Sequence, residues 1–281
     1  MTTWIDPAYG VVPWKWGPAE VRRYALAVGA PASPVDSADL RLVTTEQPEV
    51  LPTLAMLLAD AHSLRYVPLP GLDYSPADVI YAGHELELLR PLAHEESGTS
   101  TSRLLSVGDI RTGVLVRRET VSVDRRGVPL ARNIVTSVIR GARCGQPHVP
   151  ADPEAPAAIE IGDTRIDVQT LPQQALLYAQ TGDDNPLHWD PAIARAAGFE
   201  RPILHGLCTA AIVARSVLDV MTDHAWSSLR RLSVRFRSPV LPGDTLQVRI
   251  GGSGDHLSFN AQVGERLVLS DGVLDLGWES R

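Results

Sequence analysis

The chain has 281 residues, of which 44% are hydrophobic, enough for one large domain or for two domains of about 140 residues each. Its formal net charge of −7, with no block of Lys or Arg, argues against nucleic acid or an anionic membrane as the main partner. The two cysteines, Cys144 and Cys208, form no CxxC motif, and the chain shows neither a signal-like leader nor an apolar run of membrane-spanning length. We therefore expect a cytoplasmic protein.

The first half of the chain contains helical patterns followed by strand patterns. Apolar helical periodicity occurs in "GPAEVRRYALAVGAP", where the helix is expected to start at Pro18, and in "TLAMLLADAHSL". "HELELLRPL" alternates before it meets a proline, and "GVLVRRETVSVDRRGVPLARNIVTSVIRG" predicts two strands around an RRG turn. The segment "GARCGQPHVPADPEAPAA" is rich in proline and has no periodicity, which is typical of a linker. We predict a first domain at residues 1–140, a linker at 141–158 and a second domain at 159–281.

The second half repeats this order of elements. "LPQQALLYAQ" predicts a helix, and in "GLCTAAIVARSVLDVMT" the polar side chains Arg215, Asp219 and Thr222 form one narrow stripe. This second helix is therefore expected to be nearly enclosed by the protein. Alternating segments follow, with turn signals between them: "LSVRFRS", "TLQVRI", "LSFNAQV" and "RLVLSDGVLDL". One buried helix followed by an antiparallel meander predicts an α+β fold in which the sheet curls around the helix.

The similarity of the two halves indicates an internal duplication. Aligning "YALAVGAP" with "YAQTGDDNP" matches Tyr24 with Tyr178. Nothing in the first half replaces Asn185 or His188. We infer that the first copy has lost a polar loop that the second copy retains.

The polar loop "TGDDNPLHWDPAIA" carries Asp183, Asn185 and His188 within six positions. A tight turn is its simplest interpretation, because Asp and Asn side chains form hydrogen bonds to nearby backbone and proline stiffens a turn. A calcium-binding loop is excluded, since His188 occupies the place of the turn glycine and Ala194 that of the bidentate Glu.

Two further interpretations involve the segment "PILHGLCT" that follows the loop. A zinc site formed by His188, Asp190 and His205 remains open, although the spacing matches no recognised ligand pattern. Alternatively, Gly206 opens a buried helix, and its backbone N–H lies at the positive end of the helix dipole with no Cβ to block approach. This arrangement suits a reaction in which the Asp183–His188 pair transfers a proton and the Gly206 N–H stabilises the oxyanion that develops. His205 on its own is by default a structural histidine.

The loop resembles the signature of the MaoC-like, R-specific enoyl-CoA hydratases, also called hydratase 2 enzymes. The matching residues are Tyr178, Thr181, Gly182, Asp183, Asn185, Pro186, Leu187, His188 and Ala194. "FERPILHGL" resembles the second block of that family and "SPVLPGD" its sheet segment. The first half is similar, less sharply, to the degenerate half of the two-hotdog members. The resemblance implies a double hotdog fold, with an antiparallel sheet wrapped around a central helix in each half.

The resemblance also implies a chemistry for the site. Asp183 and His188 would hold a water and manage proton transfer, Asn185 would orient the site, and the Gly206 N–H would polarise a thioester carbonyl. Substrate contacts are assigned to Tyr178, Gly182, His205 and Arg201. The first domain would help to shape an acyl pocket.

The expected reaction is (R)-specific hydration of trans-2-enoyl-CoA thioesters, or the reverse dehydration of (R)-3-hydroxyacyl thioesters. A dehydratase acting on carrier-protein thioesters and a non-catalytic hotdog protein that binds acyl thioesters remain alternatives. No metal or redox cofactor is required by this chemistry. The expected partner is an acyl-CoA or acyl-carrier thioester, without nucleic acid or membrane, and the chain is expected to form a homodimer.

Overall fold

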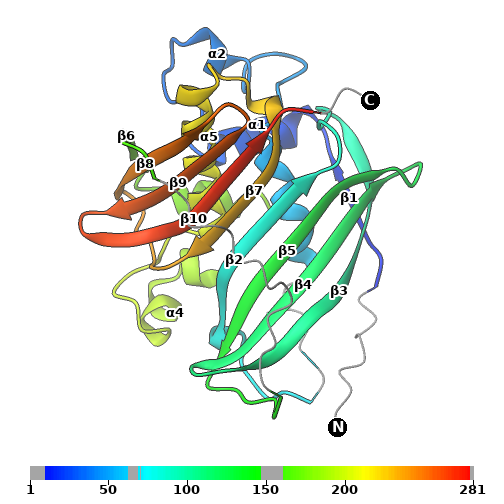
Figure 1. Ribbon diagram of the computed structural model, residues 1–281, viewed down its shortest axis with the longest axis vertical. Coiled ribbons are helices and arrows are strands. Elements are labelled where there is room, and N and C mark those ends of the chain that lie inside the picture. Colours follow the sequence, from blue (N-terminus) through cyan, green and yellow to red (C-terminus); the bar gives the residue numbers. More distant parts are fainter. Residues whose placement is uncertain (1–9, 63–68, 70, 147–160, 279–281) are drawn as a thin grey trace.

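The fold is built on one continuous antiparallel sheet of ten strands (Figure 1). The protein is described from a computed structural model, which covers residues 10–62, 69, 71–146 and 161–278. The first half contributes β1 (Val12–Trp16), β2 (Val79–Leu88), β3 (Glu96–Ile110), β4 (Gly113–Asp124) and β5 (Pro129–Arg140). The second half contributes β6 (Thr164–Gln169), β7 (Leu229–Phe236), β8 (Thr245–Ser253), β9 (His256–Val263) and β10 (Arg266–Leu276).

The order of strands repeats between the halves. The sheet runs β1-β3-β4-β5-β2-β7-β10-β9-β8-β6, so that each half places its first strand at an outer edge and its second strand at the central seam. Each half therefore has the same topology, and the predicted α+β double hotdog is confirmed. The duplication inferred from the sequence accounts for this symmetry.

The seam between the halves is formed by β2 and β7, which pair antiparallel from Gly83–Glu87 to Arg231–Arg235. Leu86 lies opposite Leu232, and both side chains are fully buried. The alternation seen in "HELEL" and "LSVRF" explains this arrangement, because side chains on a strand point to opposite faces in turn. The apolar set faces the helices, while the charged set faces outward.

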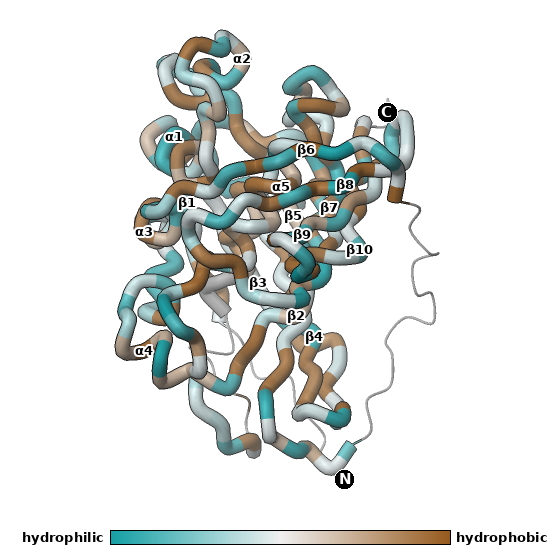
Figure 2. The backbone as a smooth tube through the Cα atoms, turned by 90° about the vertical axis from the view of Figure 1, so that its left-hand side faces the viewer, coloured by the Kyte–Doolittle hydropathy of each residue, from teal (hydrophilic) through white to brown (hydrophobic). Residues whose placement is uncertain are grey.

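Helices cover the inner face of the sheet. The α-helices are α1 (Pro18–Ala27), α2 (Ser37–Leu40), α3 (Gln174–Ala179), α4 (Pro191–Ala196) and α5 (Gly206–Met221). The 3-10 helices are η1 (Pro52–His62), η2 (Pro76–Asp78), η3 (Pro186–His188) and η4 (Trp226–Ser228). In Figure 2, where brown marks hydrophobic residues, α5 lies behind β6 and β8.

The central helix of the second half, α5, is enclosed as expected. Leu207 to Leu218 are all buried, including the side chain of Arg215. The Arg215 guanidinium donates to Asp219 at 2.9 Å and to the backbone oxygen of Gly29 in the first half at 3.2 Å. A charge this deep requires such partners. The polar stripe of α5 thus connects the two halves.

The central helix of the first half differs from expectation, because η1 has 3-10 rather than α-helical geometry. Sheet side chains bind its backbone: Asn133 donates to the oxygen of Ala55 at 3.1 Å, and Arg118 donates to the oxygen of Ala59 at 2.9 Å. Two carbonyl oxygens of η1 thus accept hydrogen bonds from side chains of the sheet. The first half is therefore held together partly by polar contacts.

The predicted linker at 141–158 lies mostly outside the described residues, which include only 141–146 of it. The domain boundaries therefore stay a prediction. Among the helices that the structure describes, none is both long and apolar enough to cross a membrane.

Candidate active site

The loop between α3 and α4 is shaped by its own polar side chains. Gly182 has a φ of 118°, a backbone conformation that other residues rarely adopt. Asn185 caps the N-terminus of η3, and its Oδ1 accepts from the N–H of Leu187 at 3.2 Å. Asp190 caps the N-terminus of α4 in the same way, accepting from the N–H of Ala192 at 2.7 Å. The tight-turn interpretation is therefore correct for this segment, and these contacts fix the position of His188.

The tautomer of His188 follows from its hydrogen bond to the backbone. Its Nδ1 lies 2.8 Å from the carbonyl oxygen of Ile203, which can only accept. Nδ1 therefore carries the proton, and in the neutral ring Nε2 is the basic nitrogen. The His188 side chain is 8% exposed. A nearly buried, oriented imidazole is well suited to take up a proton.

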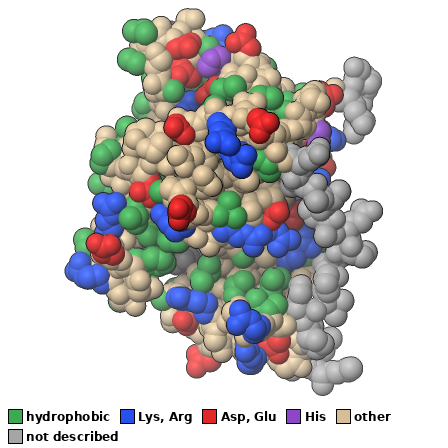
Figure 3. All heavy atoms as spheres, turned by 60° about the vertical axis from the view of Figure 1, so that its left-hand side comes forward, with side chains coloured by type: hydrophobic (Ala, Val, Ile, Leu, Met, Phe, Trp, Pro, Cys, Tyr) green, Lys and Arg blue, Asp and Glu red, His purple; other side chains and the backbone are tan. Residues whose placement is uncertain are grey.

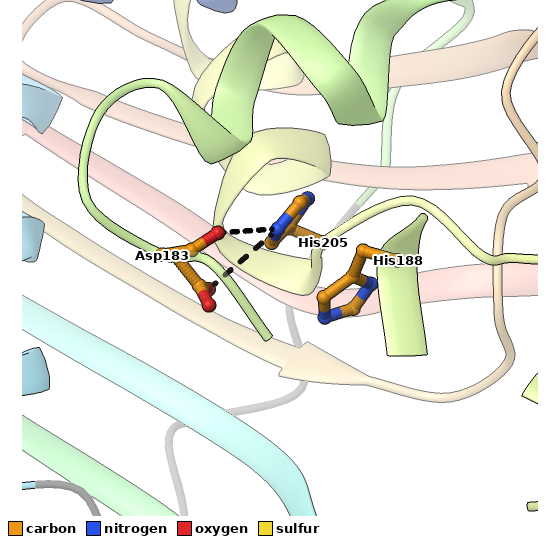
Figure 4. A group of neighbouring side chains, drawn as sticks. All are labelled: Asp183, His188 and His205. Atoms are coloured by element: carbon orange, nitrogen blue, oxygen red, sulfur yellow. Dashed lines mark hydrogen bonds and ion pairs between the residues drawn. The ribbon is translucent and has the colours of Figure 1, made fainter. Parts of the chain in front are cut away.

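His205 connects Asp183 to His188 (Figure 4). Its Nε2 is 3.1 Å from the backbone oxygen of Asp183 and 3.9 Å from the Oδ2 of the same residue. The rings of His205 and His188 are stacked, with centroids 3.7 Å apart and planes at 27°. Asp183, His188 and His205 thus bring their oxygen and nitrogen atoms within 4.8 Å of one another.

Tyr178 packs behind this group, with its ring 4.8 Å from that of His205. Tyr178 is fully buried and His205 is 1% exposed. On the other side, Tyr178 approaches Tyr24 at 6.4 Å, the residue that the internal repeat matches with it. These positions favour a role for Tyr178 and His205 in holding His188 in place, whereas their assignment to substrate contact stays a prediction.

Gly206 is the first residue of α5, which is 16 residues long. The first N–H groups of a helix have no partner within the helix, and they lie at its positive end. A Cβ at this position would approach the ring of Phe236 to 3.3 Å. The absence of a side chain therefore leaves room between α5 and β7 at the end of the helix nearest His205.

The electrostatic surroundings leave the nearby thiol inactive. Burial raises the pKa of Cys208 well above its usual value, and the negative charge of Asp183 adds to the rise. Cys208 therefore stays protonated near neutral pH. The groups of this site that suit proton transfer are therefore the carboxylate and the imidazoles.

A metal site is poorly supported by this geometry. Asp190 of the zinc hypothesis is engaged in capping α4. Asp183, His188 and His205 do lie close together, but stacked rings direct their in-plane lone pairs side by side rather than toward one ion. The donor set fits proton transfer better than tetrahedral coordination.

Arg201, predicted to contact substrate, is exposed on the segment before α5, and its assignment stays a prediction. The alternation in "LSVRFRS" predicts a strand, but it does not predict that the ring of Phe236 lies beside Gly206. Strand alternation indicates the face on which a side chain lies, but it carries no information on which helix end packs against that face.

Comparison with known proteins agrees with this geometry. The family model "MaoC like domain" matches residues 157–273, and "MFE-2 hydratase 2 N-terminal domain" matches residues 14–141. The chain is 32% identical over 278 residues to the enoyl-CoA hydratase ChsH3 of Mycobacterium tuberculosis, covering 96% of this chain and 97% of that protein. It is 28% identical to 3-hydroxyacyl-thioester dehydratase Y of the same organism, with 93% of each chain covered. The crystal structure of a MaoC-like dehydratase from Phytophthora capsici is similar with a TM-score of 0.81 and 27% identity, covering 98% of this chain and 97% of that one.

Proposed function

Because the chain belongs to the family of MaoC-like hydratases and dehydratases, we propose that it catalyses (R)-specific hydration of trans-2-enoyl-CoA thioesters, or the reverse dehydration. The observation that carries this proposal is the grouping of Asp183 and His188 within 4.8 Å, next to the N-terminus of α5. The grouping unites an acid–base pair with a backbone donor for an oxyanion.

The reaction begins with a water held between Asp183 and His188. The basic Nε2 of His188 takes a proton from this water while its oxygen bonds to the β-carbon of the enoyl thioester. The electrons of the double bond move toward the thioester carbonyl and form an enolate. The acid–base pair then returns one proton to the α-carbon, so that the enzyme regains its starting state.

The Gly206 N–H stabilises the charge that builds on the thioester oxygen. A fixed backbone donor at a helix N-terminus strengthens as negative charge develops, and such donors contribute about 3–4 kcal/mol to transition-state stabilisation. Asn185 positions the loop through its bond to Leu187. His205, stacked on His188, limits the movement of the imidazole. Each of these residues thereby favours one orientation of the reacting water.

The proposal also covers how the substrate is bound. The first half, which lacks the polar loop, contributes to the acyl pocket, and each chain carries one active site. Arg201 is exposed and meets the phosphates of CoA at the mouth of the site. Figure 3 shows basic and acidic side chains intermixed on one face of the molecule, so single arginines rather than a basic block would serve this role. The homodimer and the cytoplasmic location stay predictions.

Two alternatives remain for the same site. A dehydratase acting on carrier-protein thioesters would use the same residues but would recognise a carrier protein instead of CoA. A non-catalytic acyl-thioester-binding protein has no need of the oriented His188 or its neighbours, and the retained set argues against it.

The deciding experiment is turnover of a panel of trans-2-enoyl-CoA substrates, with the chirality of the product determined. We expect formation of (R)-3-hydroxyacyl-CoA, and loss of the activity in Asp183→Asn. Formation of the (S) product, or of no product from any member of the panel, contradicts the proposal. Turnover of carrier-protein thioesters alone would favour the first alternative.

A further inference from the structure

The inner face of the first half is unexpectedly polar for a surface that covers a central helix. Paired hydroxyl groups lie on it, with Ser100 bonded to Ser122 at 2.7 Å and Ser102 bonded to Thr120 at 2.6 Å. These pairs satisfy one another. One member of the same face, Arg118, is not satisfied in this way.

Arg118 is a buried cation that has no carboxylate partner among the residues that the structure describes. Its side chain is 2% exposed, and one nitrogen donates to the oxygen of Ala59. Among the residues that the structure describes, Nε and Nη1 of Arg118 have no hydrogen-bond partner, and no carboxylate lies within ion-pair distance. A buried charge without a partner is costly to a folded protein, by several kcal/mol. Within the described part of the chain, the surroundings of Arg118 therefore suit an added anion.

The neighbouring residues do not supply the missing negative charge. His84 bonds Asn133 at 2.8 Å, and burial, partly offset by that bond, lowers the pKa of His84 to about 4. His84 is therefore neutral near pH 7. Glu119, the next residue on β4, points to the opposite face and binds Arg103 and Arg132. Glu119 thus neutralises arginines of the outer face and does not pair with Arg118.

The strand register connects Arg118 to the candidate active site. On the inner face, Val234 of β7 is opposite His84, His84 is opposite Val135, and Val135 is opposite Arg118. Val234 is two residues from Phe236, whose ring adjoins Gly206. With strands about 4.8 Å apart, Arg118 lies about 14 Å across the sheet from Val234. This row leads from the oxyanion donor into the first half.

We propose that Arg118 binds a carboxylate at the far end of the acyl chain, so that the preferred substrates are enoyl thioesters of dicarboxylic acids. This inference rests on the proposed hydratase function and adds the substrate class. The carboxylate supplies the counter-charge that the described residues lack, and it accepts a hydrogen bond from a guanidinium nitrogen that has no partner among them. The row of residues from Val234 to Arg118 sets the direction of the acyl chain between its thioester end and its carboxylate end.

The test compares two CoA thioesters of equal length, trans-2-decenoyl-CoA and its ω-carboxy analogue, on the unmodified protein. We expect a kcat/KM about ten- to a hundredfold higher for the ω-carboxy substrate, the scale of hydrogen bonds to a charged group. Arg118→Met should abolish the preference, mainly through KM of the ω-carboxy substrate. Because the wild-type comparison is decisive by itself, the test does not depend on how well the variant folds.

Arg117→Met provides the matched control. Arg117 precedes Arg118 on β4, points to the outer face and bonds Glu85 at 2.9 Å, so its loss should leave the preference intact. Equal or lower kcat/KM for the ω-carboxy substrate in the wild type overturns the carboxylate inference while leaving the hydratase function standing. If neither substrate is hydrated, both the carboxylate inference and the proposed hydratase function are wrong.

Discussion

At the scale of single residues, the proposed catalysis depends on Asp183 and His188 acting as one unit with a shared water. Each of Asp183→Asn and His188→Ala should reduce hydration of a short enoyl-CoA by two or more orders of magnitude, about the scale of acid–base catalysis. The double variant should be little worse than either single variant, because residues that act together are not additive. Initial rates of the purified variants measure this, and near-normal turnover in either folded single variant would refute the assignment.

His84 gives a stability prediction that is separate from catalysis. Burial lowers its pKa from 6.5 to about 4 in the folded protein, so the fold favours the neutral ring. This contribution to stability is fully present above pH 6.5 and is lost as the pH falls to about 4, a difference of up to about 3 kcal/mol. Replacing His84 with Gln should therefore flatten the decline of stability across this range.

Urea unfolding at several pH values between 7 and 4 measures this effect. His94→Gln, in the connection between β2 and β3, serves as the control and should follow the wild type. An equally steep decline in His84→Gln would show that other groups cause the acid sensitivity.

The single-residue assignments divide into those that the sequence could supply and those that required the structure. The grouping of Asp183, Asn185 and His188 follows from the loop pattern, because six positions of a tight turn cannot separate them far. The stacking of His205 on His188 could not be predicted, since 16 residues, including the whole helix α4, lie between the two histidines. The Ile203 carbonyl that fixes the His188 tautomer carries no sequence signal at all.

At the scale of elements, the N-terminus of α5 is the feature with the clearest functional consequence. Gly206→Val should lower turnover by about 10²–10³, the usual cost of losing an oxyanion donor, because the added carbons crowd the approach of the thioester. It should harm folding much less, since the three atoms nearest the new Cβ all belong to the ring of Phe236, at 3.3 Å or more. Turnover and thermal unfolding of the same variant separate the two effects.

Phe236→Leu supplies the control for this substitution. If the loss in Gly206→Val came only from pressure on the Phe236 ring, combining the two changes would restore the rate. We expect no such restoration. A folded Gly206→Val protein with the wild-type rate would indicate that the glycine has a purely structural role.

The elements of the second half were more predictable than those of the first. α5 and β7 to β10 carry strong apolar periodicity, and each forms as expected. β3 escaped detection because "ESGTSTSRLLSVGDI" is rich in Ser and Thr, whose hydroxyl groups pair across strands instead of packing as apolar side chains. The 3-10 geometry of η1 could not be predicted from the sequence either. Its backbone accepts hydrogen bonds from Asn133 and Arg118, which are distant in sequence.

At the scale of the whole molecule, the two halves share a topology and differ in chemistry. The symmetric sheet order and the contact of Tyr24 with Tyr178 reflect the duplication. The Asp/Asn/His loop exists in the second half alone, whereas the first half carries the polar inner face with Arg118. Such an arrangement is consistent with one half performing the reaction and the other shaping the acyl pocket at the seam, where ligand sites are common.

This division of labour predicts one active site per chain, and the binding stoichiometry of a slowly reacting enoyl-thioester analogue tests it most directly. Isothermal titration of the analogue into the full-length protein should give one molecule bound per chain, and Asp183→Asn should leave that number unchanged. A structure of the complex should place first-half side chains around the acyl tail. Two equivalent sites per chain, or contacts to the second half alone, would contradict the account.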